Sequence, residues 1–183
     1  AKGAVLVGSL RKGSFNRHAA QAIAALAPAH LSFEIVEIGD LPLYNQEHDA
    51  LDPQPAPYVA LRETIKAADA VLFCTPEYNR SMPGVLKNAI DIASRPWGKN
   101  AFAGKPAAIV SVSVSALGGF GAHHHLKQVV GYLDMPLLNQ PEIYLSGAND
   151  LFAPDGALKK EDTKKFLQSF VAAFDRWIQK TRA

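Results

Sequence analysis

The chain has 183 residues, of which 48% are hydrophobic and 20% are charged, and its formal net charge is +2. This composition is ordinary for a globular protein and excludes disordered and collagen-like chains, and the length fits a single domain over residues 1–183. Because Lys and Arg are spread along the sequence instead of forming a stripe, we expect no nucleic-acid partner.

The apolar segments are all shorter than a bilayer-spanning helix, so we expect no membrane partner. The first residues form an apolar run that is too short for the core of a signal peptide. A single cysteine, Cys74, cannot form an internal disulfide and fits a reducing compartment. We therefore expect a cytoplasmic protein in which Cys74 is a small buried hydrophobe.

Strand-like and helix-like patterns alternate from the first residues onward. Ala4–Val7 is a continuous aliphatic run, typical of a strand buried on both faces, and from Phe15 apolar residues recur at helical spacing until Pro28. Residues 33–38 alternate between apolar and polar, as a half-exposed strand does. Residues 39–57 hold four prolines and show no helical period, which predicts a long surface loop.

The alternation continues in the rest of the chain. The patterns predict a helix over 58–67, a strand over 70–74, a helix from Met82 to about Pro96, a strand over 107–112, a helix over 120–133, a short interrupted strand over 135–138 and 143–145, and a last helix over 166–178. Parallel strands need crossover helices, so five strands and five helices in alternation predict a doubly wound α/β fold with a five-stranded parallel sheet and helices on both faces.

Two strand orders compete, the Rossmann type and the flavodoxin-like order 2-1-3-4-5, which places its ligand between the first and third strands. The polar loops follow the first, third and fourth predicted strands. We therefore favour the flavodoxin-like order.

The loop after the first strand has the residues of a phosphate site. Ser9, Ser14 and Asn16 offer side-chain hydrogen bonds, Gly13 lets the backbone turn its N–H groups inward, and Arg11 carries a guanidinium suited to phosphate oxygens. The loop lacks the lysine of a nucleotide-triphosphate loop and the glycines of a dinucleotide fingerprint. The alternative is a polar turn with an ordinary helix cap.

The loops after the third and fourth strands suit a planar ring. Pro76 stiffens the first of them, so that the amides of residues 77–80 can face a ring edge, and Tyr78 can cover apolar surface. The pair Gly118-Gly119 lets the other loop approach closely. Together the three loops predict a site for a phosphorylated, planar cofactor.

Four segments carry a family resemblance: GSLRKGSFNR, PEYNRSMPGVLKNAID, AFAGKPAAIVSVS and ALGG. They resemble the NADPH-dependent FMN reductase family, in particular its bacterial chromate and quinone reductases. The resemblance implies a flavodoxin-like fold, noncovalent FMN, and NAD(P)H as electron donor. It also implies two-electron reduction of a small-molecule acceptor: a quinone, a flavin, an azo compound or a metal oxyanion such as chromate.

Carried over by motif, the resemblance implies two sets of cofactor contacts. The FMN phosphate and ribityl end would be held by Ser9, Arg11, Ser14, Phe15 and Asn16. The isoalloxazine ring would be faced by Pro76, Glu77, Tyr78, Asn79 and Arg80, with Ser113 and Gly118 closing over it. Two positions depart from the family pattern: Ile92 stands where a tryptophan is frequent, and Ser115 stands in the place of a glycine. A glycine with positive φ there would leave Ser115 strained.

We expect no catalytic side chain, because FMN itself would carry the chemistry. Tyr78, Arg80 and Arg95 are candidates for binding the substrate, and Lys99 is a weaker one. Two alternatives remain: a flavodoxin-like electron carrier without its own substrate, which the near-neutral charge disfavours, and a scaffold without a cofactor.

Some conspicuous residues are not expected to form sites. Consecutive residues of a helix point about 100° apart, so residues 123–125, all histidines, cannot converge on a metal ion. An acid–base role for Glu77 and Asp91 has no support in the sequence. The apolar residues Ile92, Leu133 and Met135 exceed what the helix patterns need, so we expect them to pack against another subunit in a homodimer or homotetramer.

Overall fold

The computed structural model of the chain describes residues 1–182, and its core is one parallel sheet. The strand order is β2-β1-β3-β4-β5, which confirms the flavodoxin-like prediction. The strands are β1 (Lys2–Val7), β2 (Ser32–Val36), β3 (Ala70–Thr75), β4 (Ala107–Val112) and β5 (Ile143–Leu145).

Burial explains why these runs form strands. Every residue of β3 and β4 is buried, as expected for central strands covered on both faces, whereas the edge strand β2 has no buried residue. The predicted fifth strand is interrupted as expected. Leu137 forms a single bridge to the start of β4, and β5 then pairs with the end of β4.

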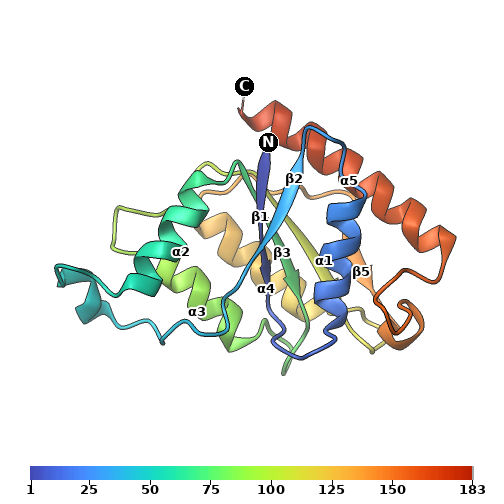
Figure 1. Cartoon of the computed structure of the whole chain (residues 1–183), viewed down its shortest axis with the longest axis horizontal. Helices are drawn as coiled ribbons and strands as arrows, with labels where there is room; N and C mark the ends of the chain where they lie inside the picture. The colour runs from blue at the N-terminus through green and yellow to red at the C-terminus, as the bar shows by residue number, and fades with distance from the viewer. Residues whose placement is uncertain (183) are drawn as a thin grey trace.

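Helices cover both faces of the sheet, and Figure 1 shows the two groups on either side of β2. They are α1 (Phe15–Ala25), α2 (Ala56–Ala67), α3 (Gly84–Ala93), α4 (Phe120–Tyr132) and α5 (Glu161–Arg182). One core cluster joins α1 and α5 to the sheet, and the other joins α2, α3 and α4 to it. The loops after β1, β3, β4 and β5 therefore meet at one end of the sheet, the lower end in Figure 1.

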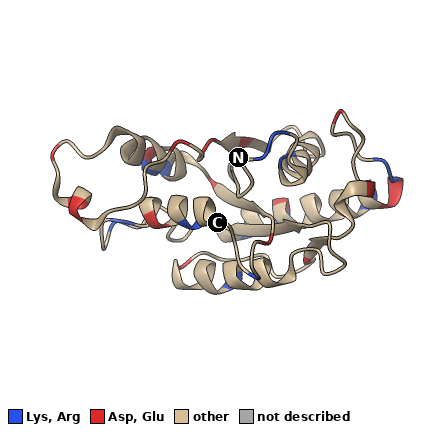
Figure 2. Ribbon diagram, turned by 90° about the horizontal axis from the view of Figure 1, so that it is seen from below, with Lys and Arg blue, Asp and Glu red and all other residues tan. Residues whose placement is uncertain are grey.

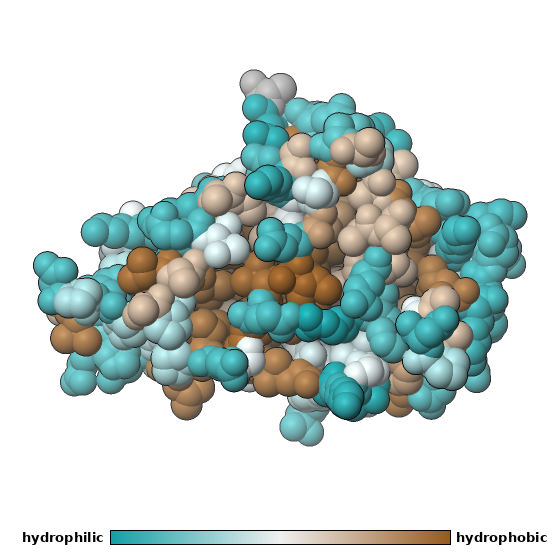
Figure 3. All heavy atoms as spheres, in the orientation of Figure 1, coloured by the Kyte–Doolittle hydropathy of each residue, from teal (hydrophilic) through white to brown (hydrophobic). Residues whose placement is uncertain are grey.

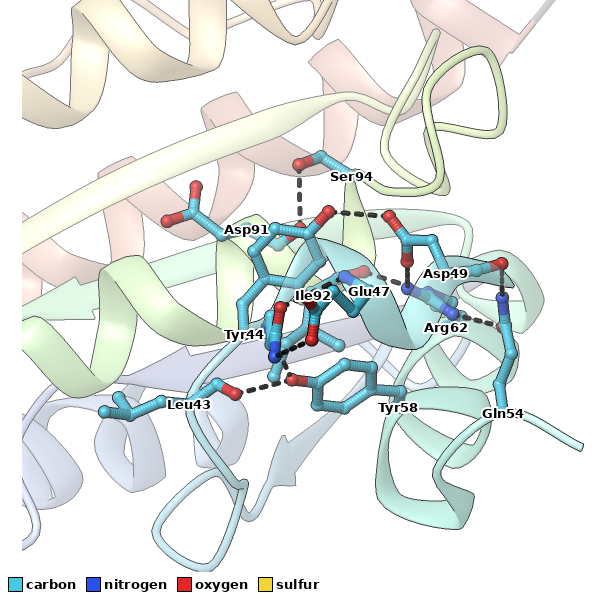
Figure 4. Close-up of polar contacts among 11 residues, drawn as sticks. Leu43, Tyr44, Glu47, Asp49, Gln54, Tyr58, Arg62, Asp91, Ile92 and Ser94 are labelled. Carbon is cyan, nitrogen blue, oxygen red and sulfur yellow. Dashed lines mark hydrogen bonds and ion pairs between the residues drawn. The ribbon is translucent and has the colours of Figure 1, made fainter. Parts of the chain in front are cut away.

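The long loop predicted over residues 39–57 is ordered by a buried arginine. It contains the short 3-10 helix η1 (Gln46–Ala50) and lies against α2 and α3. Arg62 of α2 donates from Nε to the Ile92 carbonyl at 2.9 Å, from Nη1 to Gln54 Oε1 at 2.6 Å, and from Nη2 to Asp49 Oδ1 at 3.0 Å. Tyr44 donates its hydroxyl to the other oxygen of Asp49 at 2.6 Å, and Figure 4 shows these side chains converging.

The expected subunit contact through Ile92, Leu133 and Met135 is wrong. All three are at most 5% exposed and belong to the chain's own core, beside α2 and the segment that precedes β4. Ile92, which stands where the family frequently has a tryptophan, is fully buried. These residues looked surplus because the helix patterns did not reveal the segment that covers them. That segment precedes β4, and its Asn100 side chain donates to the Leu133 carbonyl.

The surface has one hollow along the edge of the sheet. It measures about 290 Å³ and is lined by residues of β1, β2 and the C-terminal end of α2. Figure 3 shows apolar residues gathered at the centre of this face, bordered by polar ones. In Figure 2 basic and acidic residues are interspersed along the ribbon. Within residues 1–182, no helix combines the length and the apolarity needed to cross a membrane.

Candidate functional site

A cleft of about 370 Å³ opens where the loops after β1, β3, β4 and β5 meet. It is larger than the hollow at the sheet edge and it is bounded by the carboxyl ends of the strands, where doubly wound sheets bind ligands. Its lining consists of Ser9, Arg11, Phe15, Asn16, Pro76, Glu77, Tyr78, Val112, Ser113, Val114 and Asn149. The fold thus brings together four loops that lie far apart in the sequence.

The first loop presents unpaired backbone donors. Among the described residues, the N–H groups from Leu10 to Phe15 have no protein acceptor, and the loop leads directly into the N-terminus of α1. A helix N-terminus attracts anions, because its N–H groups and its dipole both point at the ligand. Arg11 lies with its guanidinium carbon 4.9 Å from the centre of the Phe15 ring. This end of the cleft suits a phosphate.

Ser14 has a different position from the other predicted phosphate contacts. It is 1% exposed, it does not line the cleft, and its hydroxyl accepts a hydrogen bond from the Arg17 N–H at 3.3 Å. Ser14 therefore caps α1. The capping alternative left open by the sequence describes this residue well, and its hydroxyl acts on the cleft by fixing the start of the helix.

Asn16 carries an unsatisfied buried acceptor. Its Nδ2 donates to the Val112 carbonyl at 3.3 Å, which links α1 to the end of β4, whereas its Oδ1 is buried and has no partner within residues 1–182. A buried oxygen without a donor costs free energy, on the order of 1–3 kcal/mol. Since Asn16 lines the cleft, a ligand hydroxyl could supply the missing donor.

The loop after β3 is held in a tight turn. Tyr78 and Ser81 exchange two backbone hydrogen bonds of 2.9 and 3.0 Å around Asn79 and Arg80. Both central residues are left-handed, with φ of 52° and 65°. Left-handed residues other than glycine are uncommon and persist where the surroundings fix them. We call residues 76–81 the ring loop, because the sequence assigns it the planar part of the ligand.

The carboxylates of this region do not form an acid–base pair. Glu77 is turned away from Asp91: its Oε2 accepts from the Ala122 N–H at 3.1 Å, and its Oε1 accepts from Arg80 Nη1 at 3.3 Å. Asp91 instead pairs with Lys87 on the outer surface of α3 at 2.8 Å. The two acids therefore have separate structural partners, and the geometry supports no general acid–base chemistry by this pair.

The loop after β4 avoids the expected strain. Ser115 is not among the residues with positive φ, and its N–H donates to Ser113 Oγ at 3.1 Å. The positive φ angles fall on Gly118 and Gly119 instead, at 58° and 84°. A Cβ on Gly118 would lie 2.9 Å from the Tyr144 backbone, so glycine is needed there for close approach to β5. Gly118 therefore lies on the side of the loop that faces β5, and it does not line the cleft.

The three consecutive histidines lie in three environments. His123 is 2% exposed and packs against Tyr144 with 4.6 Å between ring centres. His124 is exposed and its Nε2 lies 3.1 Å from the Tyr144 hydroxyl. His125 Nδ1 lies 2.8 Å from Ser81 Oγ, so it links α4 to the ring loop. Their rings do not converge on a common point.

The buried His123 should make the protein acid-labile. Burial, followed by the charge of Lys127, lowers the pKa of His123 from 6.5 to about 4. Between these values the unfolded chain binds a proton that the folded chain does not, so stability falls as the pH is lowered from 6.5 to 4, by at most about 3 kcal/mol.

Urea unfolding at pH 7 and pH 5 would measure this effect. In His123→Gln we expect a smaller difference in the free energy of unfolding between pH 7 and pH 5. The exposed neighbour His124→Gln should keep the loss seen in the unmodified chain. If all three proteins lost the same free energy of unfolding between pH 7 and pH 5, the assignment to His123 would be contradicted.

Arg95 does not border the cleft of its own chain. It lies just beyond the end of α3, over the Trp97 ring at 5.4 Å, in a separate hollow that also includes Tyr132. Lys99 lines neither hollow. Tyr78 lines the cleft, whereas Asn79 and Arg80, the next two residues of the ring loop, do not, and the Arg80 side chain is 76% exposed. Asn149, from the loop after β5, was missed by the sequence patterns because nothing local marks it as a site residue.

Comparison with known proteins identifies the family. Residues 1–150 match the family described as NADPH-dependent FMN reductase. The chain belongs to the NADPH-dependent FMN reductase family. Family membership confirms the expected NAD(P)H-dependent oxidoreductase activity and the expected FMN cofactor.

Several relatives of this FMN reductase cover nearly its whole length. A quinone reductase of Pseudomonas putida is 54% identical over 180 residues, 98% of this chain and 96% of the relative. A 2-hydroxy-1,4-benzoquinone reductase of a Burkholderia species is 49% identical over 98% of this chain and 97% of its own length. In the solved structure of FerB, a flavoenzyme NAD(P)H:(acceptor) oxidoreductase from Paracoccus denitrificans, the fold superposes with a TM-score of 0.90 at 43% identity, covering 98% of both chains.

The residues that line the cleft are chemically suited to FMN. The unpaired amides and Arg11 suit its phosphate, the free oxygen of Asn16 suits a ribityl hydroxyl, and the ring loop with Val112 and Val114 offers a narrow, partly apolar wall for its ring.

Proposed function

We propose that this FMN reductase holds FMN in the cleft between the loops after β1, β3 and β4 and reduces quinones by two electrons with NAD(P)H. The observation that carries the proposal is the cleft itself, with a donor-rich, positively charged end at Arg11 and a stiff ring loop at the other end. Relatives at 54% and 49% identity are named for quinone substrates. The bound FMN would supply hydride and electron transfer.

The residues divide into two proposed sets. Ser9, Arg11, Phe15 and Asn16 would bind the phosphate and ribityl end directly, with Ser14 holding the start of α1 in place. Pro76, Glu77, Tyr78, Asn79 and Arg80 would form the ring side, with Ser113 opposite and Gly118 keeping the third loop close. Asn149 would add a contact from the fourth loop.

The margin of the cleft favours a planar, apolar acceptor. Exposed apolar side chains gather on its loops: Leu10, Tyr78, Val114, Leu117 and Phe120 are each 49–59% exposed. Apolar groups around a site favour ligands of the same character, because they are removed from water together. Flavins and azo compounds share this character. Chromate does not, and its reduction would depend on attraction by the exposed Arg80.

A test of the proposal begins with the colour of the purified protein and the identity of the flavin released from it. We expect FMN at about one equivalent per chain, and rapid steady-state oxidation of NAD(P)H with benzoquinone when no other protein is present. An electron carrier would bind FMN but show no such turnover. A colourless protein that gains no thermal stability from added FMN would contradict the proposal, since a ligand of the native state must stabilise it.

We also propose that the whole chain works as one FMN-binding domain in the cytoplasm and assembles into a homodimer or homotetramer. The buried, single Cys74 is compatible with a reducing compartment. We assign the subunit contact to the hollow at Trp97 and Tyr132, because these side chains are 77% and 69% exposed. Such a contact could bring Arg95 of one subunit towards a neighbour's substrate. A monomeric mass at micromolar concentration would contradict it.

A further inference from the structure

Helix α4 begins without a cap of its own. Its N-cap residue is Gly119, which has no side chain to accept a hydrogen bond from the first turn. The first N–H groups of a helix need acceptors, and a side chain that supplies one stabilises the helix. The acceptor comes from another segment: Glu77 of the ring loop takes the N–H of Ala122, the third residue of the helix, at 3.1 Å.

We infer that Glu77 is a positioning residue that fixes the ring loop by capping α4, and that it does not itself bind the flavin. Its side chain is 11% exposed, and its two oxygens are occupied by Ala122 and by Arg80. A carboxylate at the N-terminus of a helix also interacts favourably with the helix dipole. This inference rests on the proposed placement of FMN in the cleft.

The contact between the ring loop and α4 is tight from the helix side as well. A Cβ on Gly121 would lie 2.8 Å from the Arg80 carbonyl oxygen and 2.9 Å from Glu77 Oε2. These separations are shorter than van der Waals contact, so any side chain at this position pushes the ring loop away. Glycine at position 121 and glutamate at position 77 are therefore two halves of one contact, 44 residues apart in the sequence.

The ring loop needs such support because of its own conformation. Asn79 and Arg80 are both left-handed, a conformation that is unfavourable for residues other than glycine because Cβ crowds the following carbonyl oxygen. Without the cap, the loop of the flavin-free protein should relax towards ordinary backbone angles. Flavin binding would then have to restore the turn. The apparent affinity would equal the intrinsic affinity multiplied by the fraction of flavin-free molecules in which the turn is still formed.

Flavin binding by the apoprotein provides the test, measured for FMN and for riboflavin by quenching of flavin fluorescence. We expect Glu77→Ala to weaken both flavins by about tenfold or more, because the loop contacts the ring that they share. Glu77→Gln keeps an acceptor for the Ala122 N–H, so it should restore both affinities to within about threefold of the unmodified protein. Gly121→Ala should reproduce the loss from the other side of the contact.

Matched controls separate this effect from general damage. Gly131→Ala lies on the same helix with nothing within 4 Å of the added methyl group, and Glu63→Ala removes another i,i+3 ion pair, that with Lys66. Both should bind flavins like the unmodified protein. Unchanged flavin affinity in Glu77→Ala and Gly121→Ala, or a Glu77→Gln variant as weak as Glu77→Ala, would overturn the inference. If the unmodified protein binds no FMN, the proposed function fails instead.

Discussion

Arg11→Glu is expected to weaken FMN binding by about 100-fold or more while leaving riboflavin binding within about threefold. Arg11 lies at the donor-rich end of the cleft, beside the unpaired amides that precede α1. The substitution removes charge-assisted hydrogen bonds to a phosphate and puts a like charge beside it. Riboflavin has no phosphate, so its affinity should depend on the contacts to the ring and the ribityl chain and not on Arg11.

Lys12→Glu is the matched control for Arg11→Glu, because it makes the same change in net charge one residue further along an exposed loop. Lys12 does not line the cleft. Its contribution should be a weak, long-range attraction that is largely screened at physiological salt. Equilibrium titration of both variants with both flavins measures the difference. Equal losses for FMN and riboflavin, or equal losses in both variants, would show that the phosphate does not bind at Arg11.

These titrations and those of Glu77 divide the cleft into two halves. A phosphate contact should distinguish FMN from riboflavin, whereas a contact that positions the ring loop should not. Arg11→Glu is therefore predicted to weaken FMN only, and Glu77→Ala is predicted to weaken both flavins. The family resemblance assigned Arg11 to the phosphate end and Glu77 to the ring as direct cofactor contacts. In the structure Arg11 lies over the Phe15 ring, whereas the Glu77 carboxylate accepts a hydrogen bond from α4.

Local patterns were sufficient for the fold. The runs at β1, β3 and β4 are continuous and largely apolar, which is typical of central strands of a parallel sheet. The polar loops that follow them gave the strand order, since ligand loops gather where the order reverses. The two loops of the cleft were visible for the same reason: each joins a buried strand to a helix.

Contacts between distant segments were not visible in the sequence. Glu77 bonds to Ala122 and Asn16 bonds to Val112, and neither partner shows a local sign of the pairing. The apolar residues Leu133 and Met135 looked surplus because the covering segment has no helical or strand period. Such pairings arise from the packing of whole elements, so propensity and periodicity do not reveal them.

The segment over residues 39–55 is the clearest case. Its prolines and lack of period predicted a surface loop, yet it is tied to the core through Arg62, which is 5% exposed. A buried charge is tolerated only when it is paired and hydrogen-bonded. Arg62 meets both conditions, with acceptors in α3, in η1 and at Gln54 (Figure 4). The loop is ordered because it supplies two of those acceptors.

Arg62→Ala is therefore expected to lower the free energy of unfolding by about 3–5 kcal/mol, the usual cost of removing one partner of a buried ion pair. The change leaves the Asp49 carboxylate with only the Tyr44 hydroxyl, and it removes the Arg62 donor from the Ile92 carbonyl, which keeps the longer hydrogen bond from the Arg95 N–H at 3.4 Å. Since domains of this kind are stable by only about 5–15 kcal/mol, the loss should be plain in urea unfolding. Arg62→Lys keeps the charge but cannot serve three acceptors at once, so we expect an intermediate loss.

Arg17→Ala provides the comparison, because Arg17 pairs with Glu37 on the surface, where the two side chains are 39% and 70% exposed. Exposed ion pairs contribute at most about 1 kcal/mol. None of the acceptors of Arg62 lines the flavin cleft, so Arg62→Ala should also keep its affinity for FMN wherever it remains folded. A loss of stability no larger than that of Arg17→Ala would show that the 39–55 segment is held by something other than its arginine. If Arg62→Ala loses the predicted free energy of about 3–5 kcal/mol but keeps its FMN affinity, Arg62 anchors this segment without affecting the proposed cofactor site.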